Sequence, residues 1–250
     1  PEAPTMATAS PADTENEISC RILSGAAPWP MPATCLPTPL TSITASVSMF
    51  RVFAFLFALF ASLSVAAAEK TILVMGDSLS AGFGLARNES WPALLGQRLQ
   101  DTGSAYVVAN ASISGETTAG GRTRIEGALK QFKPKVVILA LGANDGLRGL
   151  PVKQMRENLD TMTQAARNSG ARVLVAGMKL PPNYGAAYNR DFEAAFVAVS
   201  KQQHTALLPF LLEPIATERN AFQSDGLHPV AAAQPRILDH VWGALKPLLR

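Results

Sequence analysis

The chain has 250 residues, of which 48% are apolar and 16% charged, and its formal net charge is +3. This composition is ordinary for a globular protein and excludes wholesale disorder. The small charge, without a long basic run, gives no reason to expect a nucleic acid partner. Both cysteines, Cys20 and Cys35, lie in the first 35 residues, so neither a disulfide framework nor a thiolate metal site is expected downstream.

Residues 1–68 differ in composition from the rest of the chain. Residues 1–48 are rich in proline, alanine, serine and threonine and are expected to be disordered, or to be upstream sequence translated from a wrong start. Met49-Phe50-Arg51 is followed by an apolar run and by Ala66-Ala67-Ala68, a pattern typical of a secretory signal peptide. We therefore expect a signal peptide over residues 49–68 and a periplasmic or secreted protein that begins at Glu69. The alternative is a genuine extension before a membrane anchor, although a bilayer span needs roughly 20 apolar residues.

Residues 69–250 carry 20 Lys and Arg against 15 Asp and Glu, a net charge of +5, and are expected to form one domain. Strand-like apolar runs alternate there with stretches that repeat apolar residues at helical spacing. The predicted strands are Thr71–Met75, Ala105–Ala109, Lys135–Leu141, Arg172–Met178 and Thr205–Leu208, and the predicted helices are Trp91–Gln100, Thr117–Gln131, Pro151–Asn168, Asp191–Gln203 and Val230–Leu249, the last interrupted near Pro235. This alternation predicts an α/β fold, a three-layer α/β/α sandwich around a parallel sheet of about five strands. In such sheets the functional loops follow the carboxyl ends of the strands.

A serine stands in the first of these loops, within Gly76-Asp77-Ser78-Leu79-Ser80. A tight glycine turn after a strand can expose the Ser78 hydroxyl, although a turn or capping serine would look the same. To act as a nucleophile, the hydroxyl needs a base nearby.

His228 is the candidate base among the three histidines of residues 69–250. It lies in Asp225-Gly226-Leu227-His228-Pro229, where Asp225 can accept a hydrogen bond from the imidazole and fix its tautomer. The same pair could ligate a metal, but no further histidine or cysteine clusters nearby, so we expect no metal. His204 and His240 are expected to be ordinary surface or packing residues.

Two more loops offer donors for an oxyanion, which acyl transfer requires. Gly115, after the second strand, could offer its backbone N–H, and Asn144, after the third, its side-chain amide. Alternatively, both residues serve only to hold their turns.

Together these blocks resemble the SGNH (GDSL-type) hydrolases, in the family's order. Gly76–Ser80 resembles the nucleophile block, Ser114–Thr117 the glycine block, Gly142–Asp145 the Gly-x-Asn-Asp block and Asp225–Pro229 the Asp-x-x-His-Pro block. The resemblance covers residues 71–248 and is closest to the bacterial periplasmic thioesterase I, arylesterase and lysophospholipase subgroup. Ala143, where related sequences often have glycine, and residues 1–48 depart from the pattern.

The resemblance implies a flavodoxin-like serine esterase with no cofactor. In it, Ser78 is the nucleophile, His228 the base and Asp225 its orienting acid, while the Ser78 and Gly115 N–H groups and the Asn144 amide form the oxyanion hole. Its substrates would be aryl or short-to-medium acyl esters, and also thioesters and lysophospholipids, with no stable insertion into the membrane after signal cleavage. The expected substrate-binding residues are Asp77 and Leu79 beside the nucleophile, and Leu180, Pro181, Asn183 and Tyr184 in a loop that moves over bound acyl chains. The alternative for this loop is a plain connection between strand and helix.

Three other readings are weaker. An ordinary α/β-hydrolase elbow needs glycine where Ser80 stands. A dinucleotide-binding loop needs a third glycine after Gly82 and Gly84. A catalytically silent exported binding module could share the fold, but the intact set of Ser78, Asp225 and His228 argues against it, and an activated-serine probe would separate the two.

Overall fold

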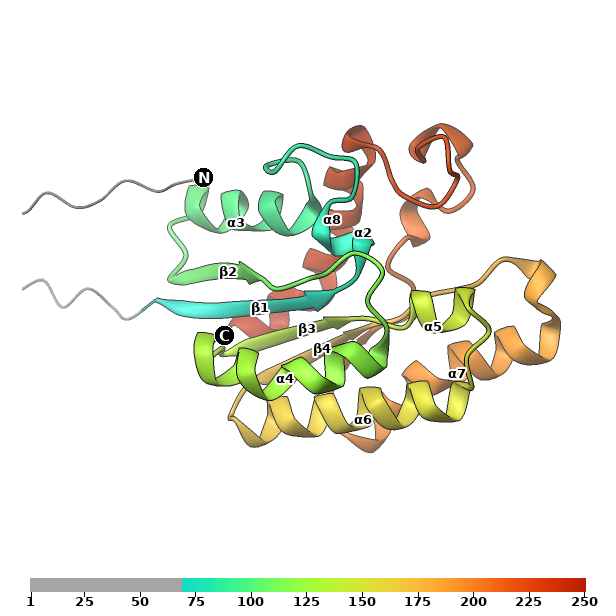
Figure 1. The fold of residues 1–250 in the computed structure, drawn as a ribbon. Coiled ribbons are helices and arrows are strands. Elements are labelled where there is room, and N and C mark those ends of the chain that lie inside the picture. Colours follow the sequence, from blue (N-terminus) through green and yellow to red (C-terminus); the bar gives the residue numbers. More distant parts are fainter. Residues whose placement is uncertain (1–68) are drawn as a thin grey trace, which may run out of the picture. The chain divides into compact units, whose positions relative to one another are not determined.

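The computed structural model describes residues 69–250, so the predicted signal peptide and residues 1–48 lie outside the described residues. Five parallel strands form one sheet in the order β2-β1-β3-β4-β5 (Figure 1). The strands are β1 (Lys70–Gly76), β2 (Tyr106–Asn110), β3 (Val136–Ala140), β4 (Arg172–Ala176) and β5 (Ala206–Leu208). The predicted α/β class and parallel sheet are confirmed.

Helices cover both faces of the sheet, as Figure 1 shows. On one face lie α3 (Trp91–Asp101) and α8 (Gln234–Leu245), and on the other lie α4 (Thr118–Phe132), α6 (Val152–Asn168) and α7 (Ala186–Gln202). Two short helices, α2 (Ser78–Ala81) and α5 (Ala143–Leu147), follow β1 and β3. Within residues 69–250, no helix is both long enough and apolar enough to cross a membrane.

Successive side chains of a strand point to opposite faces of the sheet. Because helices cover both faces, the side chains of the central strands are buried on both sides. Ile72 and Val74 of β1 contact the core under α3 and α8, whereas Leu73 and Met75 contact the core above α4, α6 and α7. All four side chains are fully buried. These near-continuous apolar runs fix the sheet, and the sheet aligns the loops after β1, β2 and β3.

Two predicted helices differ from the structure. The helix expected from Asp191 begins five residues earlier, after the 3₁₀ turn η1 (Pro182–Tyr184) and Gly185, whose φ is +92°. Its first turn, Ala186–Asn189, contains no fully buried side chain, so the apolar stripe of the sequence begins only at Phe192. The last helix is divided into η4 (Ala231–Ala233), α8 and η5 (Lys246–Leu249). The interruption expected near Pro235 lies where η4 ends and α8 begins, and Pro235 stands in the first turn of α8, where no N–H is needed.

The segment between β5 and η4 contains no strand of the sheet. It is built from the 3₁₀ turns η2 (Glu213–Ile215) and η3 (Arg219–Ala221), followed by a loop that Phe222 and Pro229 close through an antiparallel bridge. This loop carries both Asp225 and His228.

Candidate active site

The segment that carries Ser78 begins directly at the end of β1, which lies beside β3 in the sheet. Asp77 is the N-cap of α2, and its Oδ1 accepts a hydrogen bond from the Leu79 N–H at 3.0 Å. Gly82, with φ at +80°, ends this single turn of helix. Ser78 therefore stands in the first position of α2, with its side chain at the carboxyl edge of the sheet.

Ser78, His228 and Asp225 form a continuous chain of hydrogen bonds. Ser78 Oγ lies 2.8 Å from His228 Nε2, and His228 Nδ1 lies 2.7 Å from Asp225 Oδ2. The other carboxylate oxygen of Asp225 accepts from the N–H groups of Leu227 and His228, at 2.9 and 3.0 Å. These backbone donors, followed by the hydrogen bond from the His228 side chain, lower the pKa of Asp225 to about 2. A carboxylate at this position favours the His228 tautomer that carries its proton on Nδ1.

Two residues that the sequence did not single out hold His228 in place. The Phe83 ring lies against the imidazole, with ring centroids 4.5 Å apart. The Gln223 side chain donates to the carbonyl oxygens of Phe83 and Pro229, and the Gln223 N–H donates to the carbonyl oxygen of His228 at 2.8 Å. A lone glutamine gives no periodic or motif signal, so only tertiary structure identifies it.

Gly115, after β2, and Asn144, after β3, lie close together at the carboxyl edge of the sheet. Gly115 has φ at +79°, a conformation that glycine adopts without strain. Asn144 Nδ2 donates to the carbonyl oxygen of Glu116 at 3.1 Å. Since an amide carries two hydrogens, this leaves one that a ligand can accept.

Residues of α5 hold the loop that carries Gly115. The guanidinium of Arg148, which follows α5, donates to the Gly115 carbonyl oxygen at 2.9 Å. The Asp145 carboxylate accepts from both the N–H and the hydroxyl of Thr118, at 2.8 and 2.6 Å. This loop and α5 are therefore fixed relative to each other, with Asn144 serving both to hold the loop and to face the cavity.

Asp77, which directly precedes Ser78, is a buried carboxyl, 1% exposed. Burial raises its pKa to about 6, against the smaller opposing effect of the Leu79 N–H. Its Oδ2 has no hydrogen-bond partner among the described residues. An uncharged carboxyl is therefore favoured here at mildly acidic pH.

A cavity of about 530 Å³ opens beside Ser78 and extends toward β4 and β5. Its size lies within the range of roughly 300–1,000 Å³ usual for small-molecule sites. Ser78, His228, Gly115 and Asn144 line one end, and mostly apolar side chains line the rest: Leu147, Met178, Leu180, Pro181, Phe210, Leu212, Ala216, Phe222 and Leu227.

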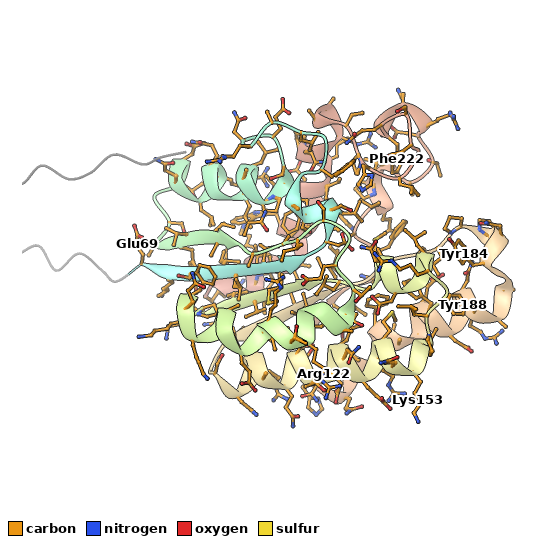
Figure 2. The ribbon with its side chains drawn as sticks, in the orientation of Figure 1. Glu69, Arg122, Lys153, Tyr184, Tyr188 and Phe222 are labelled. Atoms are coloured by element: carbon orange, nitrogen blue, oxygen red, sulfur yellow. The ribbon has the colours of Figure 1, made fainter. Side chains whose placement is uncertain are left out.

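Four of the six expected substrate-binding residues line this cavity: Asp77, Leu79, Leu180 and Pro181. Asn183 and Tyr184 are not among the described residues that line it. Asn183 is exposed in η1, and the Tyr184 hydroxyl donates to the Leu147 carbonyl oxygen at 2.9 Å. Figure 2 shows Tyr184 and Phe222 at the end of the molecule where the strands end. The η1 turn redirects the chain after Pro181, so Tyr184 supports a lining residue from behind.

The remaining histidines lie away from Ser78. His204 is exposed, and His240 Nε2 lies 3.0 Å from the Phe210 carbonyl oxygen. No group of three or more histidine, cysteine or acidic side chains within residues 69–250 is arranged to hold a metal ion.

Comparison with known proteins decides the family. The model of the GDSL-like lipase/acylhydrolase family matches residues 74–234. The chain belongs to this family. Esterase TesA of Pseudomonas aeruginosa is 51% identical over 183 residues, covering 73% of this chain and 91% of that protein. An arylesterase of Vibrio mimicus is 42% identical, covering 73% and 92%, and thioesterase 1/protease 1/lysophospholipase L1 of Escherichia coli is 41% identical, covering 74% and 87%.

Solved structures of this GDSL family share the fold. A crystal structure of TesA superimposes with a TM-score of 0.70 at 50% identity, covering 72% of this chain and 99% of that one. The expected resemblance is thus confirmed, and this GDSL-family protein is an enzyme, a carboxylic ester hydrolase.

Proposed function

We propose that this enzyme hydrolyses carboxylic esters through an acyl-enzyme formed on Ser78. As Ser78 Oγ attacks the ester carbonyl carbon, His228 Nε2 accepts its proton, and Asp225 stabilises the imidazolium that results. The observation that carries this proposal is the chain of two hydrogen bonds, 2.8 and 2.7 Å long, at the end of an apolar cavity.

The tetrahedral oxyanion would be stabilised by the backbone N–H groups of Ser78 and Gly115 and by the Asn144 amide. Collapse of the intermediate breaks the ester C–O bond, and His228 gives its proton to the leaving alcohol. Water then attacks the acyl-enzyme, with His228 as base again, and the acid and free Ser78 are released. The three proposed oxyanion donors, in α2, in α5 and in the loop of Gly115, are held by hydrogen bonds before substrate arrives, which is the condition under which such donors act strongly.

The preferred substrates in this proposal are aryl esters and esters of short-to-medium acyl chains. The lining supports this choice, since Met178, Leu180, Phe210 and Leu212 offer apolar surface next to Ser78. Thioesters and lysophospholipids present a similar carbonyl and are proposed as further substrates, in keeping with the names of the arylesterase and thioesterase relatives.

An organophosphonate probe tests the nucleophile. We expect the purified enzyme to be labelled on the peptide that contains Ser78, and Ser78→Ala to abolish both labelling and ester hydrolysis. Labelling of another serine, or hydrolysis by Ser78→Ala, would overturn the assignment. A panel of esters and thioesters of graded chain length then ranks the substrates.

We propose further that residues 49–68 act as a signal peptide and that the enzyme is exported. The short positive start, the apolar run and Ala66-Ala67-Ala68 support this. Mass analysis of protein recovered from the periplasm or medium of a bacterial host should find an N-terminus near Glu69. An intact N-terminus upstream of Met49 would contradict the proposal.

A further inference from the structure

The loop between β2 and α4, residues 111–117, carries Gly115, and we call it the Gly115 loop. Its first half is fixed to the sheet, because the N–H groups of Ala111 and Ile113 donate to carbonyl oxygens of β1 at 2.9 and 3.0 Å. Its second half leaves the sheet in a β-turn, which the Glu116 N–H closes by donating to the Ile113 carbonyl oxygen at 3.2 Å. The central residues of this turn, which include Gly115, are exposed. The position of Gly115 therefore depends on side chains that hold the turn from outside.

One arginine of α4, Arg124, spans the Gly115 loop. Its Nε donates to Glu116 Oε1 at 2.7 Å, and one of its terminal nitrogens donates to the other carboxylate oxygen of Glu116. The same nitrogen donates to the Ala111 carbonyl oxygen at 3.0 Å. The guanidinium therefore joins the turn that carries Gly115 to the half of the loop that is fixed to the sheet.

The pair of Arg124 and Glu116 is partly shielded from water. The Arg124 side chain is 30% exposed and the Glu116 side chain only 7%. Gly120, in the first turn of α4, leaves room for the carboxylate, since a Cβ there would stand 3.1 Å from Glu116 Oε1. A shielded pair with two parallel hydrogen bonds is screened less and has a more definite geometry than an ion pair on the surface. The pair can therefore fix the place of Glu116.

Glu116 connects this pair to the proposed oxyanion hole through its main chain. Its carbonyl oxygen accepts from Asn144 Nδ2 at 3.1 Å, and the residue directly follows Gly115. One residue thus contacts Arg124 with its side chain and Asn144 with its main chain. A displacement of Glu116 would move both the Asn144 amide and the Gly115 N–H.

We propose that Arg124 is a positioning residue for the oxyanion hole and acts through Glu116. Arg124 is not among the described residues that line the cavity, so its effect on the reaction is indirect. Loss of its three hydrogen bonds would release the turn and displace the two donors from the oxyanion. A displacement of about 1 Å can lower the rate on the order of 10²-fold. This inference rests on the proposed function, because it concerns the oxyanion hole of that reaction.

Arg124→Met tests the inference in steady-state hydrolysis of a soluble aryl ester. We expect kcat to fall by about tenfold or more while KM changes by less than about twofold, because the donors act on the oxyanion rather than on the bound ester. Arg98→Met is the matched control and should keep the parental kcat. The Arg98 side chain is also 30% exposed and is paired with Asp239 at 2.6 Å, but it joins α3 to α8, and none of the described residues that line the cavity belongs to these helices.

A double substitution separates positioning from a general loss of stability. When Asn144→Ala has already removed one donor, Arg124→Met should lower kcat further by only about threefold or less, because the two residues act on the same group. An undiminished effect in that background would overturn the proposal. So would equal kcat in Arg124→Met and Arg98→Met, or a rise in KM at constant kcat.

Thermal unfolding shows which variants are folded under the assay conditions. If Arg124→Met does not fold, Arg124→Lys takes its place, since lysine keeps the charge but lacks the planar fork that reaches both the carboxylate and Ala111. We expect its kcat to fall by about threefold, and a parental kcat would overturn the proposal. Failure of the parent to hydrolyse esters, or phosphonate labelling of a serine other than Ser78, would instead contradict the proposed function.

Discussion

The side-chain amide of Gln223 donates a hydrogen bond of 2.8 Å to the carbonyl oxygen of Phe83. The same nitrogen lies 3.2 Å from the Pro229 carbonyl oxygen. One amide thereby links the loop that follows Ser78 to the loop that carries His228. Gly84 permits this contact, since a Cβ there would stand 2.3 Å from Gln223 Oε1.

Gln223→Leu should lower kcat by about tenfold, because His228 loses a neighbour that fixes its loop. The lost hydrogen bonds should also reduce the free energy of unfolding by about 1–2 kcal/mol. Steady-state kinetics and thermal unfolding measure the two effects. Gln202→Leu, on the exposed face of α7, is the control. Unchanged kcat in Gln223→Leu would show that Phe83 alone keeps the imidazole in place.

His228→Ala should reduce turnover by about 10⁴-fold or more, because Ser78 then lacks a proton acceptor. Asp225→Ala should be damaging but less so, since Asp225 acts through His228. With its pKa lowered to about 2, Asp225 stays ionised throughout the usual assay range, and no loss of activity near neutral pH should trace to it. The rate of ester hydrolysis, measured from about pH 4 upward, checks this expectation. This lower limit lies about two pH units above the pKa of Asp225. If His240→Ala abolished activity while His228→Ala did not, the assignment of the base would be wrong.

Asn144→Ala should lower kcat by about 10²–10³ while KM changes little, because the amide is aimed at the oxyanion rather than at the ground-state carbonyl. The hydrogen bond to Glu116 is lost too, so thermal unfolding must accompany the kinetics. Asn168→Ala, at the exposed end of α6, is the matched control. A large rise in KM at constant kcat would make Asn144 a binding residue.

Asp77 should make the folded state more stable at low pH. Because its pKa rises from 3.8 to about 6 on folding, the folded state binds the proton more tightly. Its contribution is therefore fully present below pH 3.8 and is lost as pH rises through about 6. A shift of this size corresponds to about 3 kcal/mol.

Asp77→Asn isolates that contribution, since asparagine also caps a helix well. The free energy of unfolding, measured against pH for both proteins, should show a decline between the two pKa values that the variant lacks. Parallel curves for parent and variant would mean that Asp77 does not titrate in this way.

Pro181→Ala should change the preferred acyl length, because Pro181 lines the cavity while Ser78 is untouched. Pro182→Ala is the matched control, since Pro182 is exposed in η1 and is not a lining residue. One methylene in an apolar pocket is worth roughly 1–3 kcal/mol, so kcat/KM across a chain-length series should change rank order. A uniform fall in Pro181→Ala would assign this residue to folding instead.

The sheet could be predicted from sequence because its strands are short apolar runs that need no distant partner to be recognised. β3, for example, is buried along its whole length. The short helices α2 and α5 could not be predicted, since four or five residues are too few to show a helical period. They form where capping and tertiary hydrogen bonds, such as that between Asp145 and Thr118, hold the backbone.

The sequence motifs around Ser78, Gly115, Asn144 and His228 could be recognised because each contains polar residues and glycine within a few positions of one another, in a loop after a strand. The apolar end of the cavity could not be predicted. Phe210, Leu212 and Phe222 come from a segment of 3₁₀ turns without periodicity, and long-range packing alone brings them beside Met178 and Leu180. The prolines and Gly185 indicate a turn around Tyr184, but only the tertiary structure shows that the turn η1 directs the Tyr184 hydroxyl to the Leu147 carbonyl oxygen.

Ser78 and His228 are 150 residues apart in the chain, one directly after the first strand and the other in the last loop before α8. No contiguous half of the domain contains both. During synthesis Ser78 emerges long before His228, so under the proposed function the growing chain cannot yet cleave esters. The chain can become active only after its last loop has been made and has folded against the first strand. Measured turnover therefore reports that the whole domain has reached its native state.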